Sequence, residues 1–395
     1  MLSKPQTDIN DLLLVKATPE QSKITKQISY IEGDPSELTL EQYLELEKIL
    51  TNLEFTRDNF QVWILISKKD QHQEAPTILS TCGTIKRKAL VKDTTTDKSD
   101  KLRGVGEGGR GNVREIICHS IASVFTPLNF RNNGYASSML KLLSDILVKE
   151  LKAEFSFLFS DIGPHFYQRL GWNVDDHKEI RFNVDNNTHI SDSANNLDNN
   201  IIVEDTKKII SQDDLERIIQ QDCQLIYQEF SQLDFSAFLV LPTKPNFEWH
   251  FERSKIYAKI KNVEITTLGV ELIGRSINNN KNNHSLGFIL WFHDFRDQKL
   301  TILRFRSNNQ KVTKLLIEHA KREAQRSNLT QVVVWNPDMK LFPNVKEGNN
   351  KNDDNGELVE RKDSLPFLAC HYKEPSHFSH FKWLLLEKYT IFCRP

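Results

Sequence analysis

The sequence predicts an α/β protein built from two successive units, each a layered arrangement of strands and helices. Three observations predict this class. Apolar strands alternate with amphipathic helices over residues 11–172, an order typical of layered α/β folds. A similar order returns from about residue 235, which indicates a second unit of related structure. An Asn- and Asp-rich tract at residues 185–200 separates them and is too polar to form a core. A chain of 395 residues favours two or three domains, and we place two of them at residues 1–190 and 201–395.

The first unit is predicted to centre on a parallel pair of strands. An apolar strand at residues 11–17 precedes Thr18 and Pro19, which are typical of a helix N-cap and first helical position. The nearly all-apolar strand at residues 155–161 is typical of a sheet interior. Because a helix separates it from the preceding strand, the two should be parallel and joined by a right-handed crossover. The other predicted elements here are helices at residues 38–53, 137–151 and 162–172 and strands at residues 60–69, 77–91 and 113–126.

The second unit repeats the order strand, strand, helix, strand. The predicted elements are strands at residues 284–292, 299–307 and 331–335, a helix at 311–324 and a late strand or hairpin at 381–392. The relation between the two units rests on this order of elements and not on sequence identity.

The composition argues against several classes of protein. Lys and Arg number 52 and Asp and Glu number 53, so the chain lacks the basic field of a nucleic-acid or membrane-surface binder. No apolar run is long enough to span a bilayer, and the first ten residues do not resemble a secretory signal. The five cysteines are scattered and form no CxxC pair, which predicts reduced thiols in a cytoplasmic protein and no metal site. We therefore expect a small-molecule substrate. The oligomeric state is not indicated.

The junction between the strand at 113–126 and the following helix has the features of an anion site. A helix start carries unpaired N–H groups and partial positive charge. Gly134 lets a bulky anion approach the backbone, and Arg131 can donate two hydrogen bonds to a phosphate. Pro127 helps the strand part from its neighbour. This combination predicts a diphosphate site, whereas the alternative is an ordinary strand–turn–helix connection.

A second motif downstream identifies the anion. The pattern RxxGxA at residues 131–136 resembles the acetyl-CoA pyrophosphate loop of the GCN5-related N-acetyltransferase (GNAT) superfamily. In that superfamily a Y-x-x-x-G-[FW] motif follows after one helix and one strand, and this chain has Tyr167, Gly171 and Trp172 at that place. The resemblance implies a GNAT fold. This is a mixed, mostly antiparallel sheet with a central parallel strand–helix–strand crossover, followed here by a second, degenerate GNAT-like α/β domain.

A closer resemblance is to the fungal lysine N6-acetyltransferase family of lysine catabolism. It is carried by SIASVFTPLNFRNNGYASSML, FSFLFSDIGPHFYQRLGW, TCGTIKRKALV and LPTKPNFEWHFER. The resemblance implies that acetyl-CoA is the cosubstrate and L-lysine the acceptor, with direct transfer in a ternary complex. The alternatives are another amine or a protein lysine as acceptor, and a non-catalytic CoA-binding scaffold.

The resemblance also implies roles for individual residues. The strand ending at Val124 and Phe125 should pair with the pantetheine arm, and Tyr167 should act as the general acid to the CoA thiolate. Arg131 should support the diphosphate. The backbone amides implied to hold that diphosphate belong to Asn132, Asn133, Gly134, Tyr135 and Ala136.

The base and the acceptor pocket are less defined by sequence. Glu115 and His119 lie on the strand that leads to the thioester site, and either is a candidate base. His119 is equally consistent with a sheet histidine and Glu115 with an exposed strand start, and proton loss through water needs no dedicated residue. Trp249 and His250 are candidates to line a substrate pocket between the halves, although a tryptophan is more often simply core.

The second unit is predicted to lack a cofactor site of its own. The place that corresponds to the diphosphate loop has Asn308, Asn309, Gln310 and Lys311, with no glycine. No YxxxG motif follows the strand at 331–335. We therefore expect this half to close the substrate side or to support the fold.

Overall fold

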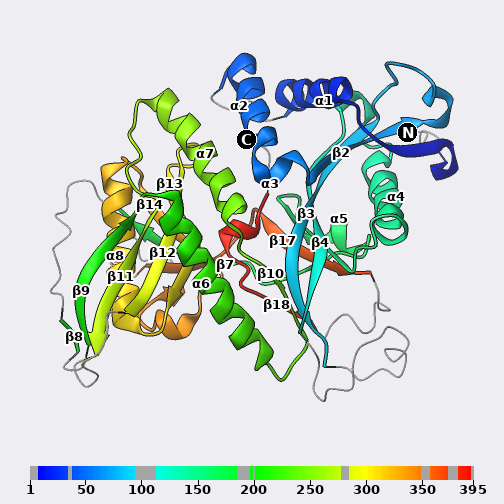
Figure 1. The fold of residues 1–395 in the computed structure, drawn as a ribbon. Coiled ribbons are helices and arrows are strands. Elements are labelled where there is room, and N and C mark those ends of the chain that lie inside the picture. The colour runs from blue at the N-terminus through cyan, green and yellow to red at the C-terminus, as the bar shows by residue number, and fades with distance from the viewer. Residues whose placement is uncertain are drawn as a thin grey trace.

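The computed structural model describes residues 8–33, 38–94, 113–184, 196–198, 201–276, 284–347, 356–371 and 381–392. Most of the predicted boundary tract lies outside them. Within these residues the chain forms two nine-stranded sheets. Figure 1 shows them as two lobes, with two long helices, α6 and α7, between them.

The first half of the chain contains every element predicted for it. These are β1 Leu12–Lys16, α1 Pro19–Glu32, α2 Leu40–Asn52, α3 Glu54–Arg57, β2 Phe60–Ser67, β3 Ser80–Lys92, β4 Val113–Phe125, α4 Tyr135–Lys149, β5 Phe155–Ser160, α5 Pro164–Gln168, β6 Asn173–Val174 and β7 Lys178–Asn183. The start predicted for α1 is confirmed, because Thr18 forms a capping box with Gln21. The helix predicted over residues 162–172 is shorter and is followed by Gly171 at a φ of 96°.

The first sheet is the mixed, mostly antiparallel sheet that the GNAT resemblance implies. Its main order is β1-β2-β3-β4-β5-β17-β6. Strands β4 and β5 form its central parallel pair, with residues His119–Ile121 opposite Ser156–Leu158, and α4 is the crossover between them. A second parallel pair, β10 with β18, lies off the main path of this sheet. One face of α4 packs on this sheet through Met139, Leu140, Leu143 and Leu147, all fully buried.

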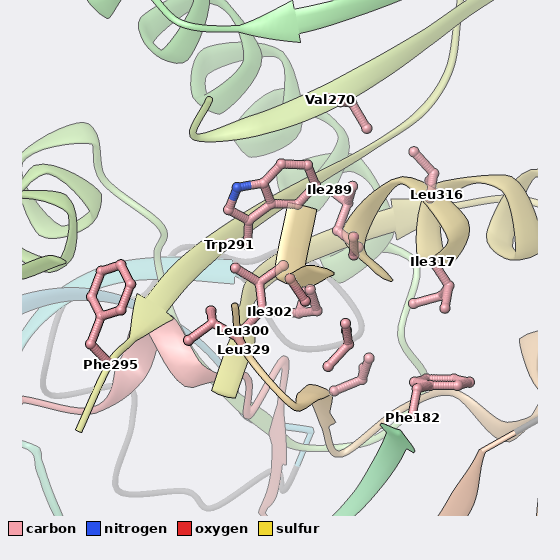
Figure 2. Packing of buried hydrophobic residues seen from close by; sticks show 14 of the residues in the cluster. Phe182, Val270, Ile289, Trp291, Phe295, Leu300, Ile302, Leu316, Ile317 and Leu329 are labelled. Atoms are coloured by element: carbon pink, nitrogen blue, oxygen red, sulfur yellow. The ribbon is translucent and has the colours of Figure 1, made fainter. Parts of the chain in front are cut away.

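The second half builds a sheet of similar plan. Its elements are β8 Asn196–Asp198, β9 Ile201–Ile209, α6 Gln212–Ser231, β10 Ala237–Val240, α7 Lys244–Lys261, β11 Gly269–Ser276, β12 His284–Asp294, β13 Lys299–Ser307, α8 Gln310–Arg326, β14 Gln331–Trp335, β15 Lys346–Glu347, β16 Glu357–Glu360, β17 Leu365–Cys370 and β18 Lys382–Leu384. Strands β13 and β14 are parallel and α8 connects them. Figure 2 shows Trp291 and Ile302 of this sheet on the same core as Leu316 and Ile317 of α8.

The two sheets exchange strands across the predicted boundary. Strand β7 from the first half pairs with β14 and β16 in the second sheet. In return β17 pairs with β5, and β10 pairs with both β3 and β18. The late strand predicted for the second unit, now β18, therefore lies in the first sheet. The boundary predicted between the two halves of the chain is therefore not the boundary between the two sheets.

None of the helices in the described ranges is both long and apolar enough to cross a bilayer. The same ranges contain no group of three or more His, Cys, Asp or Glu side chains arranged to hold a metal ion. Cys118 and Cys223 form no disulfide.

Candidate active site

The candidate site lies where β4 and β5 diverge. The parallel ladder between them ends at Ile121 and Leu158, yet both strands continue. On its other side β4 has a bulge, because Ala122 pairs with Gly83 whereas the next paired residue, Phe125, is opposite Thr81. A bulge bends its strand and leaves backbone groups outside the ladder. The two strand ends are therefore open to a ligand.

A cavity of about 810 Å³ occupies this divergence, which is within the usual size of small-molecule sites. Its walls come from β4, the loop before α4, the first turn of α4, the end of β5 and α5. The predicted cofactor residues that line it are Val124, Phe125, Arg131, Asn132, Gly134, Tyr135 and Ala136, and the predicted acid Tyr167 joins them. Residues separated by up to about forty positions are thus brought to one place. Asn133 supports the loop instead, since its Nδ2 donates to the carbonyls of Phe130 at 3.0 Å and Arg131 at 3.1 Å.

The amino end of α4 has the properties that an anion site requires. Gly134 is its N-cap, at a φ of 78°, and no side chain caps the helix. Asn132 also has positive φ, 62°. The first-turn amides of a 15-residue helix are therefore without a side-chain acceptor, and the helix dipole adds partial positive charge. Such an end favours a phosphate group.

The side chain of Arg131 is held in place by contacts that leave its positive charge without a carboxylate partner among the described residues. Its Nε donates to the carbonyl of Thr126 at 3.0 Å, and its guanidinium lies 5.6 Å from the centre of the Phe125 ring. No ion pair of Arg131 is present within the described ranges. An exposed arginine held in this way beside a helix start can add a charged contact to a diphosphate.

Tyr167 is buried at the inner wall of the cavity. It is 4% exposed, and its ring packs against Phe166 and Phe367 at centre-to-centre distances of 5.0 and 5.1 Å. Burial raises the pKa of its phenol to about 12, although a hydrogen bond with Ser160 acts in the opposite direction. The phenol is therefore protonated at neutral pH and can donate that proton.

Ser123 is a site residue that the sequence did not indicate. It lies in the bulge with a φ of 53° and lines the cavity, and its buried Oγ has no hydrogen-bond partner in the described residues. Such buried hydroxyls are uncommon without a ligand or water. No sequence signal marks a serine in this conformation. The lining residues Phe159, Ser160 and Asp161 could have been predicted, because ligands bind at the carboxyl ends of parallel strands.

The two candidate bases lie outside the cavity. His119 is 3% exposed and does not line it, and burial, with smaller effects of Lys86 and His371, lowers its pKa to about 4. Glu115 is near the opposite end of β4, about 26 Å along the strand from Ser123. There it accepts a hydrogen bond from Tyr227 and pairs with Lys88 at 3.7 Å. A role for Glu115 as base does not fit this position.

Trp249 and His250 lie on α7 inside the molecule, and neither lines the cavity. Each is 1% exposed. The ring of Trp249 contacts Phe392 at 5.0 Å, and His250 contacts Phe292 at 5.6 Å. Burial lowers the pKa of His250 well below its usual value. Both side chains therefore occupy core positions between the two sheets.

The corresponding helix end in the second sheet is closed. Asn309 is the N-cap of α8, and its Oδ1 accepts a hydrogen bond from the Val312 amide at 2.9 Å. A side chain thus occupies the position that is open at α4. A larger hollow of about 1320 Å³ lies between α1, α2 and α7. It is lined mainly by Leu, Ile, Lys and Glu of the helix surfaces and includes none of the motif residues.

Comparison with known proteins identifies the family of the chain through its second half. A model of the LYC1 GNAT-like C-terminal domain matches residues 188–392. The fold and the site define a protein of the GCN5-related N-acetyltransferase class. Within it, the chain belongs to the LYC1 GNAT-like family, close to the fungal lysine acetyltransferases.

Individual relatives are distant. A lysine acetyltransferase of Yarrowia lipolytica is 22% identical over 361 residues, which are 80% of this chain and 82% of that protein. A GCN5-related N-acetyltransferase from Kribbella flavida has a TM-score of 0.50 at 12% identity, covering 91% of this chain and 70% of its own. A probable N-acyltransferase of unknown function from Enterococcus faecalis has a TM-score of 0.52 at 11% identity, covering 91% and 72%. These two structures show the shared fold alone.

Proposed function

We propose that the protein is an acetyl-CoA-dependent N-acetyltransferase that acetylates the ε-amine of free L-lysine by direct transfer in a ternary complex. The observation that carries the proposal is the cavity between β4 and β5, with an uncapped helix end at one side and a buried, neutral tyrosine at the other. The similarity to a lysine acetyltransferase supports lysine as the acceptor. On this proposal the protein acts in lysine degradation in the cytoplasm.

The described residues fit acetyl-CoA as the cosubstrate. The amides at the start of α4 and the side chain of Arg131 suit its diphosphate. The unpaired edge of β4 at Val124 and Phe125 suits the pantetheine amides, which can pair with a strand edge. Bound acetyl-CoA would supply the activated acetyl group.

Three functions then fall to this chain. The cavity must hold the two substrates close together, which removes an entropic barrier. On this proposal a backbone N–H at the Ser123–Val124 bulge stabilises the negative charge that develops on the carbonyl oxygen. Tyr167 gives its proton to the departing thiolate. Asp161 is the carboxylate among the lining residues, and we include it as the proton acceptor to be tested.

The test is an assay of thiol release by the full-length protein with acetyl-CoA and a panel of amines. Lysine should drive release, and Tyr167→Phe should lower kcat by roughly 10²–10⁴-fold. Tyr227→Phe is a matched control, because that phenol lies at the far end of β4, on Glu115. Asp161→Asn should lower kcat if Asp161 is the acceptor of the proton.

The same assay separates the alternatives. Transfer to peptide lysines in preference to free lysine would indicate a protein substrate. Binding of CoA without thiol release for any amine would indicate the scaffold function and contradict the proposal.

A further inference from the structure

Glu32 lies at the carboxyl end of helix α1, where a carboxylate is unfavourable. It is the last residue of the helix, and the last turn carries no basic side chain. The partial negative charge of a helix end repels a carboxylate at this place. Glu32 makes no ion pair among the described residues. Its position is therefore better explained by a contact outside the helix.

The carboxylate of Glu32 binds the turn that precedes the diphosphate loop. Its Oε2 accepts a hydrogen bond from the backbone amide of Leu128 at 2.7 Å. Leu128 begins a short 3-10 turn, and Pro127 before it provides no side-chain cap. The carbonyl of Leu128 accepts a hydrogen bond from the amide of Arg131 at 3.2 Å. A single residue thus links Glu32 to the arginine assigned to the diphosphate.

Helix α1 and this turn are not closely packed around the hydrogen bond. A hollow of about 290 Å³ lies between them, lined by Ile24 and Ile28 of α1 on one side and by Pro127 and Phe130 on the other. A gap of this kind provides few dispersion contacts. Among the described residues, the contact of Glu32 is the hydrogen bond that joins α1 to the turn.

Helix α1 is itself anchored, so it can hold the turn in one place. Nζ of Lys26 pairs with the buried carboxylate of Glu47 on α2 at 2.9 Å. The rings of Tyr30 and Tyr43 lie 5.2 Å apart, centre to centre, and the Tyr30 hydroxyl donates to the carbonyl of Leu38 at 2.6 Å. A loop fixed to such a support loses less conformational freedom when a ligand binds.

We propose that Glu32 is a positioning residue for the cosubstrate. It fixes the turn before Arg131 and so holds the guanidinium and the first amides of α4 ready for the diphosphate. The inference rests on the proposed function. Its essential part is the hydrogen bond and not the negative charge, because a neutral amide oxygen can also accept from the Leu128 amide.

The experiment measures steady-state kinetics and CoA binding for full-length wild type, Glu32→Ala and Glu32→Gln. Glu32→Ala should raise KM for acetyl-CoA and Kd for CoA by about fivefold to twentyfold, as expected for loss of one hydrogen bond to a charged group. Its kcat and its KM for lysine should change by less than about twofold. Glu32→Gln should stay within about threefold of wild type. Pantetheine, which lacks the diphosphate, should inhibit all three proteins equally.

Leu128→Pro tests the same hydrogen bond from its other side. It removes the donor N–H, and the extended conformation of Pro127, with a ψ of 147°, accommodates a following proline. The Leu128 side chain is 53% exposed, so little packing is lost. Leu128→Pro should raise KM for acetyl-CoA by a factor similar to that of Glu32→Ala. The double variant should be no worse than either single one, because both remove one interaction.

Glu20→Ala is the matched control on the same helix. Glu20 is exposed in the first turn of α1, where a carboxylate is favourable. Its removal weakens the helix without affecting the contact with Leu128. We therefore expect Glu20→Ala to have the wild-type KM for acetyl-CoA.

Each outcome supports or overturns the inference. Wild-type values of KM and Kd in Glu32→Ala would overturn it and leave the proposed function intact. Equal losses for CoA and pantetheine, or for Glu20→Ala and Glu32→Ala, would indicate a general structural effect and also overturn it. Independent, additive losses in the double variant would do the same. If Glu32→Ala does not fold, Leu128→Pro decides. Absence of CoA binding by the wild type would overturn the proposed function and this inference with it.

Discussion

The rings of Phe367 and Tyr167 lie 5.1 Å apart, centre to centre, with their planes tilted by 48°. Tyr167 belongs to the first half of the chain, whereas Phe367 belongs to β17 in the second. Phe367 is fully buried. The second half therefore helps to position the proposed proton donor, although its own helix end is closed.

Truncation of Phe367 should affect both stability and catalysis. Phe367→Ala removes a buried ring and should cost about 3–5 kcal/mol in the free energy of unfolding. Phe367→Leu should cost less and still lower kcat, because Tyr167 loses one wall. Urea unfolding and thiol-release kinetics check both. Normal kcat in a folded Phe367→Leu protein would contradict the positioning role.

The rate of the reaction should not fall through ionisation of Tyr167 at any pH below about 11. Burial raises the pKa of Tyr167 to about 12, so the phenol stays protonated while the lysine amine, with an ordinary pKa of about 10.4, becomes neutral. We expect kcat/KM for lysine to rise with pH up to about 10. A fall with an apparent pKa near 10, present in the wild type and absent in Tyr167→Phe, would be inconsistent with a buried donor.

Gly134→Glu should abolish CoA binding through bulk and like charge at the diphosphate. Gly171→Glu is a matched control, because Gly171 also has positive φ, is exposed, and has open space around a built Cβ. Both variants carry comparable backbone strain of about 1–2 kcal/mol. Calorimetric titration with CoA should separate them, and unimpaired binding by Gly134→Glu would rule out the diphosphate assignment.

The buried ion pair between Asp222 and Arg304 should contribute more to the free energy of unfolding than the exposed ion pair between Glu229 and Arg306. Nε of Arg304 donates to Asp222 at 2.7 Å, and Asp222 has no exposed side-chain surface. Asp222→Ala removes a buried carboxylate that pairs with both Arg304 and Arg306 and leaves buried Arg304 with Glu387 alone, so it should cost about 3–5 kcal/mol. Glu229, whose side chain is 62% exposed, also pairs with Arg306, yet Glu229→Ala should cost about 1 kcal/mol or less. Equal losses of unfolding free energy would contradict this account.

Mild acid should destabilise the protein through histidines whose pKa burial lowers, namely buried His250 and His119 and partly buried His371. Burial lowers the pKa of His119 and of His371 from 6.5 to about 4, so between these values the unfolded chain binds more protons. The stabilisation is present above pH 6.5 and is lost as pH falls to about 4, on the order of 3 kcal/mol for each histidine. His371→Gln should lose less stability than wild type between pH 7 and 5. His72→Gln, at an exposed position, should behave as wild type.

Local patterns allowed much of the first half to be predicted. Regular alternation, the Thr18 cap and the apolar run of β5 each have a short-range physical cause. Helix α7 was missed because its buried face includes polar His250, Arg253 and Ser254, which weakens the amphipathic period. The exchange of strands between the two sheets was also missed; it involves β7, β10, β17 and β18. Strand pairing depends on contacts between residues far apart in the sequence, which no local pattern encodes.

The same division holds at the site. The loop from Arg131 to Ala136 and Tyr167 were predictable, because their chemistry depends on short motifs. Ser123 was not, since its role comes from a bulge in the register with β3.

The strand exchange also has a consequence for the order of events during synthesis. β5 leaves the ribosome roughly 200 residues before β17, which at 5–20 residues per second is a delay on the order of ten seconds or more. During that time the apolar edge of the nascent first sheet has no native neighbour. A chaperone that binds extended apolar segments would have the most time to bind the exposed edge of β5. Premature termination anywhere before residue 365 would release a protein whose first sheet is unfinished.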